Sequence, residues 1–320
     1  MGKQKKVAVT YPEGVYVAPK KSLFKYIITN KWLYILLVPA ILYLLIFNYL
    51  PMFGIVIAFQ DFNMVKGIFR SEFIGFENFA LLLKEPRFYE VFVNSVVLSF
   101  YNLIFGFPMP VIIAVLLNEV KQDFFKRFVQ TVSYLPHFIS WVVISGMLIN
   151  YLSQSNGMVN FVIAKLGGEK IPFLMSPKYF RGVIVIANIW KECGWGAIVY
   201  LAAMSNLDQQ VYEAALIDGA NRFQRMRYIT IPGIMSTIVT MLILRMGSIM
   251  NNGFEQIFML QNLRNLEVSE VFETYTYKQG LMLGNFGYST AVGLFKSVVN
   301  FFLVMTTNWI SRKVGQKGLW

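Results

Sequence analysis

Two side chains that carry much of protein chemistry are nearly absent from this sequence. Its 320 residues include one cysteine, Cys193, and one histidine, His137. A single cysteine allows no disulfide within the chain, and a lone histidine beside Pro136 cannot build a metal site. We therefore expect Cys193 to be a small packing residue within an apolar run. We expect His137 to be a packed or interfacial ring rather than a catalytic group.

Motifs for nucleotide chemistry are absent as well. No phosphate-binding loop of the pattern G-x-x-x-x-G-K-[ST] occurs. The nearest stretch, GLFKS at 293–297, lacks the glycine before the lysine. We also find no nucleophile–base pair and no metal constellation. The sequence therefore predicts a chain that is not an enzyme, binds no cofactor itself and leaves any ATP to another polypeptide.

Charged residues are scarce, at 14% of the chain against 56% hydrophobic residues. Soluble domains have about 25% charged and 45–50% apolar residues, so these totals favour a bilayer over a large soluble core. Six apolar runs are long enough to cross about 30 Å of hydrocarbon as helices. They are Trp32–Ala58, Val91–Leu117, Val132–Asn150, Gly182–Met204, Gly233–Asn251 and Thr290–Ile310. The first contains two prolines and is expected to tilt, kink or leave the bilayer at its end.

Lysine and arginine are unevenly shared between the two sides of these spans. Sixteen lie in the two terminal tails and the even-numbered loops, ten lie in the odd-numbered loops, and three lie within spans. Because basic loops face the cytoplasm, both termini are predicted to be cytoplasmic. The basic N-terminal tail is not followed by a short apolar stretch ending in small residues, so it is not expected to be a secretory signal. It can contact anionic lipid head groups. Within the outer segment 253–289 we expect a short amphipathic helix, Val268–Tyr277.

The loop between the fourth and fifth spans has the strongest local signals. It reads NLDQQVYEAALIDGANRFQRMRYITIP. Asp208 fits a helix N-cap, residues 209–217 fit a short helix, and Gly219 fits a stop at positive φ. A second short helix with three arginines follows, and Pro232 fits the first turn of the next span. The loop is predicted to be a bent pair of helices whose small side chains allow another surface to approach closely.

This loop resembles the EAA motif of binding-protein-dependent ABC importer permeases. The motif falls on Glu213, Ala214, Ala215, Gly219, Ile229, Ile231 and Pro232. The family pattern has leucine where Ile231 stands. The segments IWKECGWGAIVYLAAM, NNGFEQIFML and TAVGLFKSVVNF…GLW are similar to the polysaccharide permeases typified by LplB, which are related to maltose and alginate importer permeases. This likeness covers most of residues 30–320.

The resemblance implies an all-α polytopic membrane protein with the type I ABC importer permease fold. Its cytoplasmic coupling loop, residues 206–232, would dock into a groove of an ATPase subunit through Glu213, Ala214, Ala215, Asp218 and Gly219. Implied partners are a second homologous permease, two ATPase subunits that bind ATP and Mg, and an extracytoplasmic sugar-binding protein. Membrane lipid is expected as a partner and nucleic acid is not. The implied layout is a basic tail over 1–31, a transmembrane domain over 32–312 and a C-terminal tail over 313–320.

Polar side chains within the spans suggest a pathway, because charges at mid-membrane usually face a cavity or a partner. On the fourth span, Asn188, Glu192 and Trp195 share one helical face, and Lys191 lies beside it. Resemblance to the maltose permease places sugar-contacting positions on Asn188, Lys191, Glu192, Trp195, Arg245, Ile249 and Asn252. Tryptophan can stack on a sugar, and the polar groups can bond its hydroxyls. Alternatively, Glu192 pairs with Lys191, Arg245 or a partner subunit to hold helices together.

The expected function is therefore that of a permease subunit, in a bacterial cytoplasmic membrane, that imports oligosaccharides by alternating access. Lys191 and Arg245 lead us to expect an acidic substrate, such as a uronate-containing oligosaccharide. Two alternatives stay open: an ABC importer permease for a non-sugar solute, and a stand-alone secondary transporter. An inverted repeat or broken helices would favour the second alternative, and we expect neither.

Overall fold

The computed structural model describes residues 26, 28–315 and 318. Most of the predicted N-terminal tail 1–31 and half of the predicted C-terminal tail 313–320 lie outside these residues. The chain divides into two units, Met1–Gly54 and Ile55–Trp320.

The described part of the first unit is helical. It comprises α2 (Lys31–Leu44), a π turn η1 (Leu45–Tyr49) and α3 (Leu50–Met52). With the 3₁₀ segment η2 (Phe53–Phe59), these form a 29-residue apolar stretch, Lys31–Phe59. No residue of α2 is buried, and a helix that is apolar on all sides fits a membrane span. The predicted first span is confirmed. Its backbone changes from α to π geometry at Leu45, back to α at Leu50 and to 3₁₀ at Phe53.

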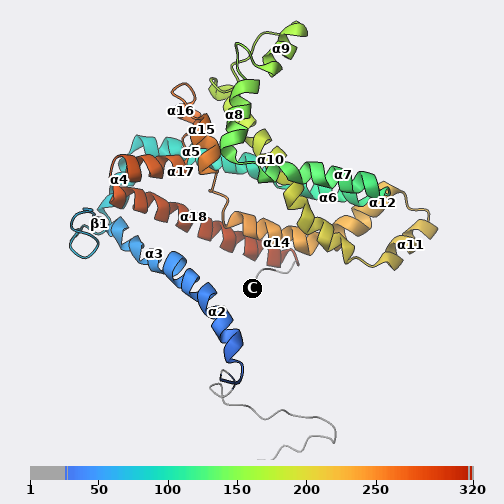
Figure 1. Ribbon diagram of the computed structural model, residues 1–320, viewed down its shortest axis with the longest axis horizontal. Coiled ribbons are helices and arrows are strands. Elements are labelled where there is room, and N and C mark those ends of the chain that lie inside the picture. Colours follow the sequence, from blue (N-terminus) through green and yellow to red (C-terminus); the bar gives the residue numbers. More distant parts are fainter. Residues whose placement is uncertain (1–25, 27, 316–317, 319–320) are drawn as a thin grey trace, which may run out of the picture. The chain divides into compact units, whose positions relative to one another are not determined.

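Long helices form the frame of the second unit. They are α5 (Pro86–Tyr101) joined through a π turn η3 (Asn102–Gly106) to α6 (Pro108–Asn118), α10 (Pro177–Ser205) and α18 (Phe286–Lys313). In Figure 1 these helices run between one end that carries α4 (Glu77–Lys84) and another that carries α11 (Gln209–Ile217) and α12 (Arg222–Arg225). We call these the α4 end and the α11 end. At the α4 end, β1 (Gln60–Asp61) pairs antiparallel with β2 (Glu72–Phe73).

The predicted third span, Val132–Asn150, is wrong as a single helix. The chain forms α7 (Asp123–Tyr134) and a 3₁₀ turn η4 (Leu135–Phe138), and then bends by 99° into α8 (Trp141–Tyr151). Pro136 lacks an N–H and favours the break. Ser140 begins α8, because its hydroxyl accepts a hydrogen bond from the Val143 N–H at 3.4 Å.

The predicted fifth span, Gly233–Asn251, is also not one straight helix. A π turn η5 (Met226–Thr230) and α13 (Ile231–Gly233) are bent by 58° relative to α14 (Met235–Met246). α14 ends at Met246, five residues before the predicted boundary, and the glycine that follows, Gly247, lies close to Val304 of α18. The second unit therefore contains two broken helices where the sequence led us to expect none.

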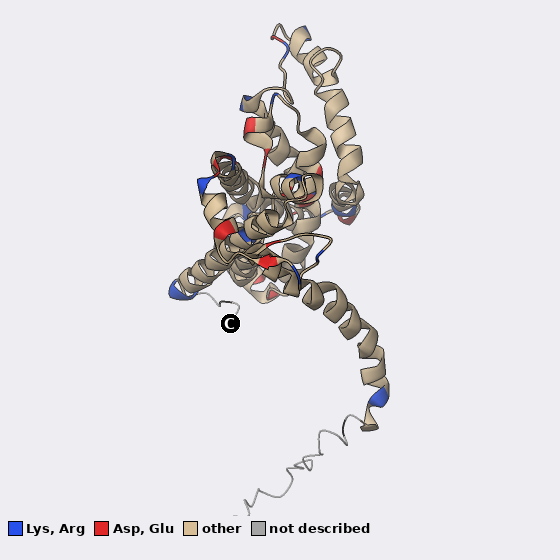
Figure 2. Ribbon diagram, turned by 90° about the vertical axis from the view of Figure 1, so that its left-hand side faces the viewer, with Lys and Arg blue, Asp and Glu red and all other residues tan. Residues whose placement is uncertain are grey.

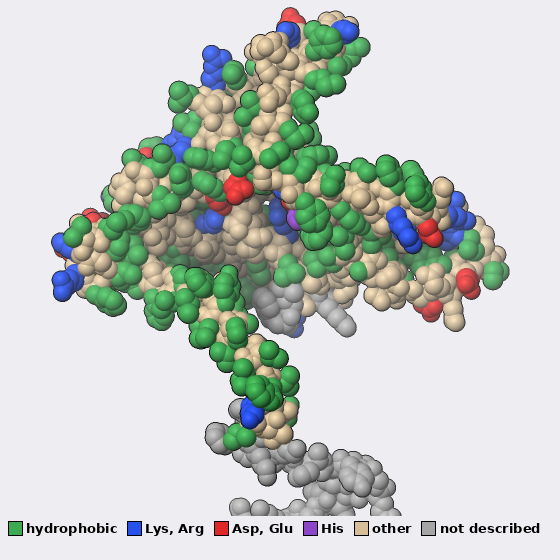
Figure 3. All heavy atoms as spheres, in the orientation of Figure 1, with side chains coloured by type: hydrophobic (Ala, Val, Ile, Leu, Met, Phe, Trp, Pro, Cys, Tyr) green, Lys and Arg blue, Asp and Glu red, His purple; other side chains and the backbone are tan. Residues whose placement is uncertain are grey.

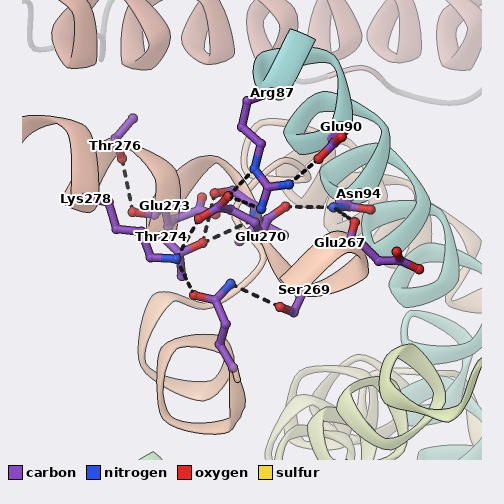
Figure 4. Close-up of polar contacts among 12 residues, drawn as sticks. Arg87, Glu90, Asn94, Glu267, Ser269, Glu270, Glu273, Thr274, Thr276 and Lys278 are labelled. Atoms are coloured by element: carbon purple, nitrogen blue, oxygen red, sulfur yellow. Dashed lines mark hydrogen bonds and ion pairs between the residues drawn. The ribbon is translucent and has the colours of Figure 1, made fainter. Parts of the chain in front are cut away.

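The segment between α14 and α18 folds into short helices. They are α15 (Phe254–Leu260), α16 (Leu266–Ser269), α17 (Phe272–Tyr277) and a π turn η6 (Lys278–Met282). The single helix predicted over Val268–Tyr277 is wrong, because Glu270 is extended and turns its carboxylate inward. That carboxylate binds Arg87 of α5 at 2.8 Å and Lys278 at 2.6 Å (Figure 4). Burial of a carboxylate requires such partners, so they decide where the helix breaks.

Apolar surface dominates the exterior. Figure 2 shows few charged residues along the long helices, and Figure 3 shows hydrophobic side chains over most of one face. Four helices are long and apolar enough to cross a membrane, or six if each bent pair counts as one span. Within the described residues, this confirms the predicted all-α polytopic membrane protein with about six spans.

Candidate translocation cavity and coupling segment

A cavity of about 430 Å³ lies between α10, α14, η3 with α6, and the residues leading into α15. Glu192 and Arg245 are its only charged lining residues within the described chain. Its neutral polar side chains are mostly amides, and its aromatic side chains include Trp141 and Trp195. Figure 3 shows a hollow near the centre of one face, where charged side chains of both signs and the histidine gather. Aromatic rings together with a few convergent polar groups are typical of a small-molecule site.

The predicted stripe on α10 faces this cavity. Asn188, Glu192 and Trp195 all line it, as their helical spacing indicates. The amide of Asn188 donates to the Oδ1 of Asn102 at 2.9 Å. Asn102, in turn, donates to the carbonyl of Leu98 at 3.1 Å. These bonds fix the side-chain amides of Asn188 and Asn102 where α10 meets η3, so this wall of the cavity is ordered before any ligand binds.

The opposite wall comes from the chain around α14. Arg245 and Asn252 line the cavity, whereas Ile249 is buried in an apolar cluster and does not. Asn252 is held by Ser95 and Ser99 of α5, at 3.2 Å and 3.3 Å. Within the described chain, the Arg245 side chain has no hydrogen bond or ion pair, although the charge of Glu192 acts on it. A guanidinium with five N–H donors is thus available inside the cavity.

Lys191 is turned away from the cavity. Its ammonium is buried and donates to the carbonyls of His137 at 2.5 Å, Ile139 at 2.7 Å and Pro136 at 3.4 Å. It also lies 4.0 Å from Glu192. The sequence placed Lys191 beside the pathway stripe, but its position on α10 directs the side chain at the break between α7 and α8.

His137, which the sequence led us to treat as a packing residue, belongs to this assembly. Its ring stacks on Trp195, with centroids 4.7 Å apart and an interplanar angle of 2°. Its Nδ1 lies 2.9 Å from the Glu192 carboxylate. The sequence could have predicted this contact from Pro136 and Ser140, because the break between these residues brings His137 to α10. Of the partners that the sequence suggested for Glu192, Lys191 lies 4.0 Å away, and the nearer contact, with His137, was not predicted.

A second cavity, of about 450 Å³, lies at the α4 end. Asp61, Glu85, Tyr275 and Tyr288 are among its lining residues, and the two tyrosine hydroxyls are 3.0 Å apart. None of the predicted pathway residues lines it. Among the described residues, no group of three or more His, Cys, Asp or Glu side chains is placed to hold a metal ion.

The coupling loop has the predicted local structure. Asp208 caps α11, because its carboxylate accepts from the Gln210 N–H at 2.9 Å, and α11 ends before Gly219, which has φ of 79°. The predicted helix over 209–217 is therefore confirmed. Tyr212 and Thr230 join α11 to η5 through hydroxyls 2.8 Å apart. Asn221 begins α12 with a reciprocal capping box to Gln224, a feature that was not predicted.

None of the predicted docking residues is buried. Glu213, Ala214, Asp218 and Gly219 are exposed, Ala215 is partly exposed, and no residue of α11 is buried. Leu216 and Ile217 are 56% and 87% exposed. A helix with exposed acidic, small and large apolar side chains, held at both ends, is suited to contact another protein.

The long apolar helices enclose a polar cavity, and one end of the bundle carries an exposed pair of short helices, α11 and α12. This combination is that of a membrane transport subunit. The family described as "Binding-protein-dependent transport system inner membrane component" matches residues 106–316. The chain belongs to this family, and it is a multi-pass membrane permease.

Relatives in both sequence and structure agree with this membership. Protein LplB of Bacillus subtilis is 47% identical over 290 residues, covering 91% of each chain. The polygalacturonan/rhamnogalacturonan transport system permease protein YteP of the same organism is 45% identical over 301 residues, covering 94% of each. A crystal structure of a bacterial ABC transporter involved in the import of the acidic polysaccharide alginate contains a chain with a TM-score of 0.84 and 39% identity. That match covers 91% of this chain and 99% of the other. The type I ABC importer permease fold is thereby confirmed.

Proposed function

We propose that this permease carries uronate-containing oligosaccharides inward across the cytoplasmic membrane of a bacterium. The observation that carries the proposal is the Arg245 guanidinium, which lines the cavity without a hydrogen-bonded partner in the described chain. The cavity's carboxylate, Glu192, is already engaged by His137 at 2.9 Å. Arg245 is therefore the lining group with free charged donors, and a planar guanidinium matches a carboxylate through two parallel hydrogen bonds.

The remaining lining suits a sugar. Trp195 is 43% exposed and offers an apolar ring to a pyranose face. Asn188, Asn252 and Gln256 supply amides, which can donate to and accept from hydroxyls. A volume of about 430 Å³ falls within the range of about 300–1,000 Å³ found for small-molecule sites.

The similar proteins support an acidic substrate. YteP is described as a polygalacturonan/rhamnogalacturonan permease, and the matched transporter imports the acidic polysaccharide alginate. Both polymers carry uronate carboxylates. Their permeases are similar to this chain over most of its length, so the same substrate class is the simplest explanation for a charged arginine in the cavity.

Uptake by the assembled transporter in proteoliposomes tests the substrate. We expect uptake of trigalacturonate and much weaker uptake of its carboxyl-reduced, neutral analogue. Arg245→Gln removes a charge-assisted pair worth about 1.5–3 kcal/mol, so trigalacturonate uptake at low concentration should fall by about ten- to hundredfold. Arg264→Gln, at an exposed position outside the cavity, is the matched control. Equal uptake of both sugars, unchanged by Arg245→Gln, would refute the acidic substrate.

We further propose that ATP hydrolysis takes place on two separate ATPase subunits, which hold ATP and Mg, and that α11 transmits it. A second homologous permease would complete the pathway, and an extracytoplasmic sugar-binding protein would deliver the substrate. The structure of the alginate transporter in complex with an alginate pentasaccharide-bound periplasmic protein supports the last partner. Glu213→Arg reverses a charge on the exposed face of α11, so it should abolish ATPase binding or uptake without unfolding the chain. Retention of both by this variant would exclude a coupling role.

The two broken helices favour one alternative, because discontinuous helices also build the sites of secondary transporters. A secondary transporter would be driven by an ion gradient without ATP. Uptake into proteoliposomes with ATP but no ion gradient therefore supports the importer. Uptake with a gradient alone would support the alternative.

A further inference from the structure

The bend between η4 and α8 leaves backbone carbonyls without helical partners, because a 99° turn interrupts the hydrogen-bond ladder. The carbonyls of His137 and Ile139 both point to the ammonium of Lys191, at 2.5 Å and 2.7 Å. The carbonyl of Pro136 lies 3.4 Å away and also accepts from the Ile139 N–H at 3.1 Å. One buried cation on α10 thus satisfies the exposed ends of a broken helix.

An ammonium has three donors, and these three carbonyls can use all of them. The Lys191 Nζ also lies 5.7 Å from the centre of the Trp141 ring, within reach of a cation–π attraction. The residue is buried and does not line the cavity. Lys191 therefore has neither the free donors nor the access that direct contact with a sugar requires.

The backbone that Lys191 holds carries His137 into the rim of the cavity. The His137 ring lies flat on Trp195, and its Nδ1 is 2.9 Å from the Glu192 carboxylate. Phe138, the next residue, meets Trp195 edge to face at 5.5 Å. We propose that Lys191 is a positioning residue. By fixing the carbonyls of the bend, it holds His137 against Trp195 and Glu192 and so shapes the part of the cavity that receives a sugar ring.

The consequence for binding rests on the proposed function, since it assumes that the cavity takes an oligosaccharide. Trp195 is 43% exposed as a residue and the Glu192 side chain is 41% exposed, so neither is fixed by burial. His137 restrains both of them, and Lys191 restrains His137. Loss of the ammonium should therefore weaken sugar binding and leave the coupling loop, at the α11 end, unaffected.

Three variants of the assembled transporter test this proposal. Lys191→Met keeps the length of the side chain and removes every donor, whereas Lys191→Arg keeps a buried cation. Lys296→Met is the matched control, because Lys296 is a largely buried lysine of α18 that pairs with Glu273 at 2.9 Å outside this cavity. The measurements are KM and maximal rate for trigalacturonate uptake, and hydrogen exchange of the amides in 136–145.

For Lys191→Met we expect KM to rise about tenfold, the equivalent of one or two lost hydrogen bonds, with the maximal rate changed less than twofold. Exchange in 136–145 should become faster. Lys191→Arg should restore most of both effects, and Lys296→Met should leave both unchanged. In a His137→Ala background, Lys191→Met should raise KM little further, because the two residues act in series.

Two results would overturn the proposal. Faster exchange with an unchanged KM would show that Lys191 stabilises the bend without shaping the site. A raised KM with unchanged exchange would show that Lys191 meets the sugar directly. If Lys191→Met does not assemble, Lys191→Gln, which keeps two donors, is measured in the same way.

Failure of the proposed function can be distinguished from failure of this inference. If the wild-type transporter takes up no acidic oligosaccharide, labelling of Cys193 by a small maleimide still reports the shape of the cavity. Cys193 lines the cavity and is the chain's only cysteine. Lys191→Met should change its labelling rate severalfold and Lys296→Met should not. Equal rates in the two variants would refute the positioning role whatever the substrate.

Discussion

The close contact between α7 and α10 offers a test of the packing behind the cavity. Gly194, on α10, lies against the backbone of Ser133 on α7. A Cβ added at Gly194 would stand 2.0 Å from the Ser133 carbonyl oxygen and 2.4 Å from its carbon. Real Cβ atoms essentially never approach closer than 3.0 Å, and these neighbours are backbone atoms that cannot rotate away. Gly194→Ala should therefore push the two helices apart by about 1 Å.

The cost of such overpacking is about 1–3 kcal/mol. For a large domain, about 1 kcal/mol shifts the midpoint of thermal unfolding by roughly 2–4 °C, so Gly194→Ala should lower it by about 2–12 °C. Gly182 is the matched control, because it lies on the same helix with nothing within 4 Å of its added Cβ. There, alanine improves helix propensity and should leave the midpoint equal or slightly higher.

Thermal unfolding of the purified transporter in one detergent, followed by loss of the monodisperse species, measures both variants. The same samples should show faster maleimide labelling of Cys193 in Gly194→Ala, because Cys193 lines the cavity and directly precedes the displaced residue on α10. If Gly194→Ala is as stable as Gly182→Ala, the helices are not in the contact described here and the reasoning fails.

Two further predictions concern the α4 end of the bundle. Glu270→Gln leaves Arg87 and Lys278 without their shared buried carboxylate, so thermal stability should fall by the equivalent of about 3–5 kcal/mol; a change below 1 kcal/mol would mean that water screens the cluster. Burial raises the pKa of Tyr275 above its ordinary value of 10.0. Its protonated form stabilises the fold fully below pH 10, and this contribution declines as the pH rises further, because the unfolded chain then ionises first. Between pH 10 and 11 the wild type should therefore lose more stability than Tyr275→Phe, and equal losses would contradict the burial of this hydroxyl.

Local rules predicted the coupling loop well. Asp208, the helix over 209–217 and Gly219 each follow from preferences of neighbouring residues, so no distant contact was needed to place them. The apolar runs likewise predicted the long helices, because a bilayer selects spans by length and composition. The helical spacing of Asn188, Glu192 and Trp195 predicted that they share a face, and they do line one cavity.

The failures arise where a distant side chain decides the backbone. The third span breaks after Pro136, and the carbonyls that the break frees are bound by Lys191, which lies more than fifty residues further along the chain. The break at Glu270 depends on Arg87 in the same way. Periodicity within a span could not show that Ile249 turns into an apolar cluster, because α14 ends at Met246 and the helical register stops there. The pathway and docking roles of the named residues remain predictions.

The exposed apolar face of α11 has a consequence for the life of the protein in the cell. Leu216 and Ile217 are 56% and 87% exposed on a helix that lies beyond the membrane-spanning stretches. Until another protein covers them, these side chains are exposed to water and form a hydrophobic site that chaperones and proteases can bind. A copy made in excess of its companions should be cleared quickly, so the amount of this subunit would follow the supply of whatever covers α11.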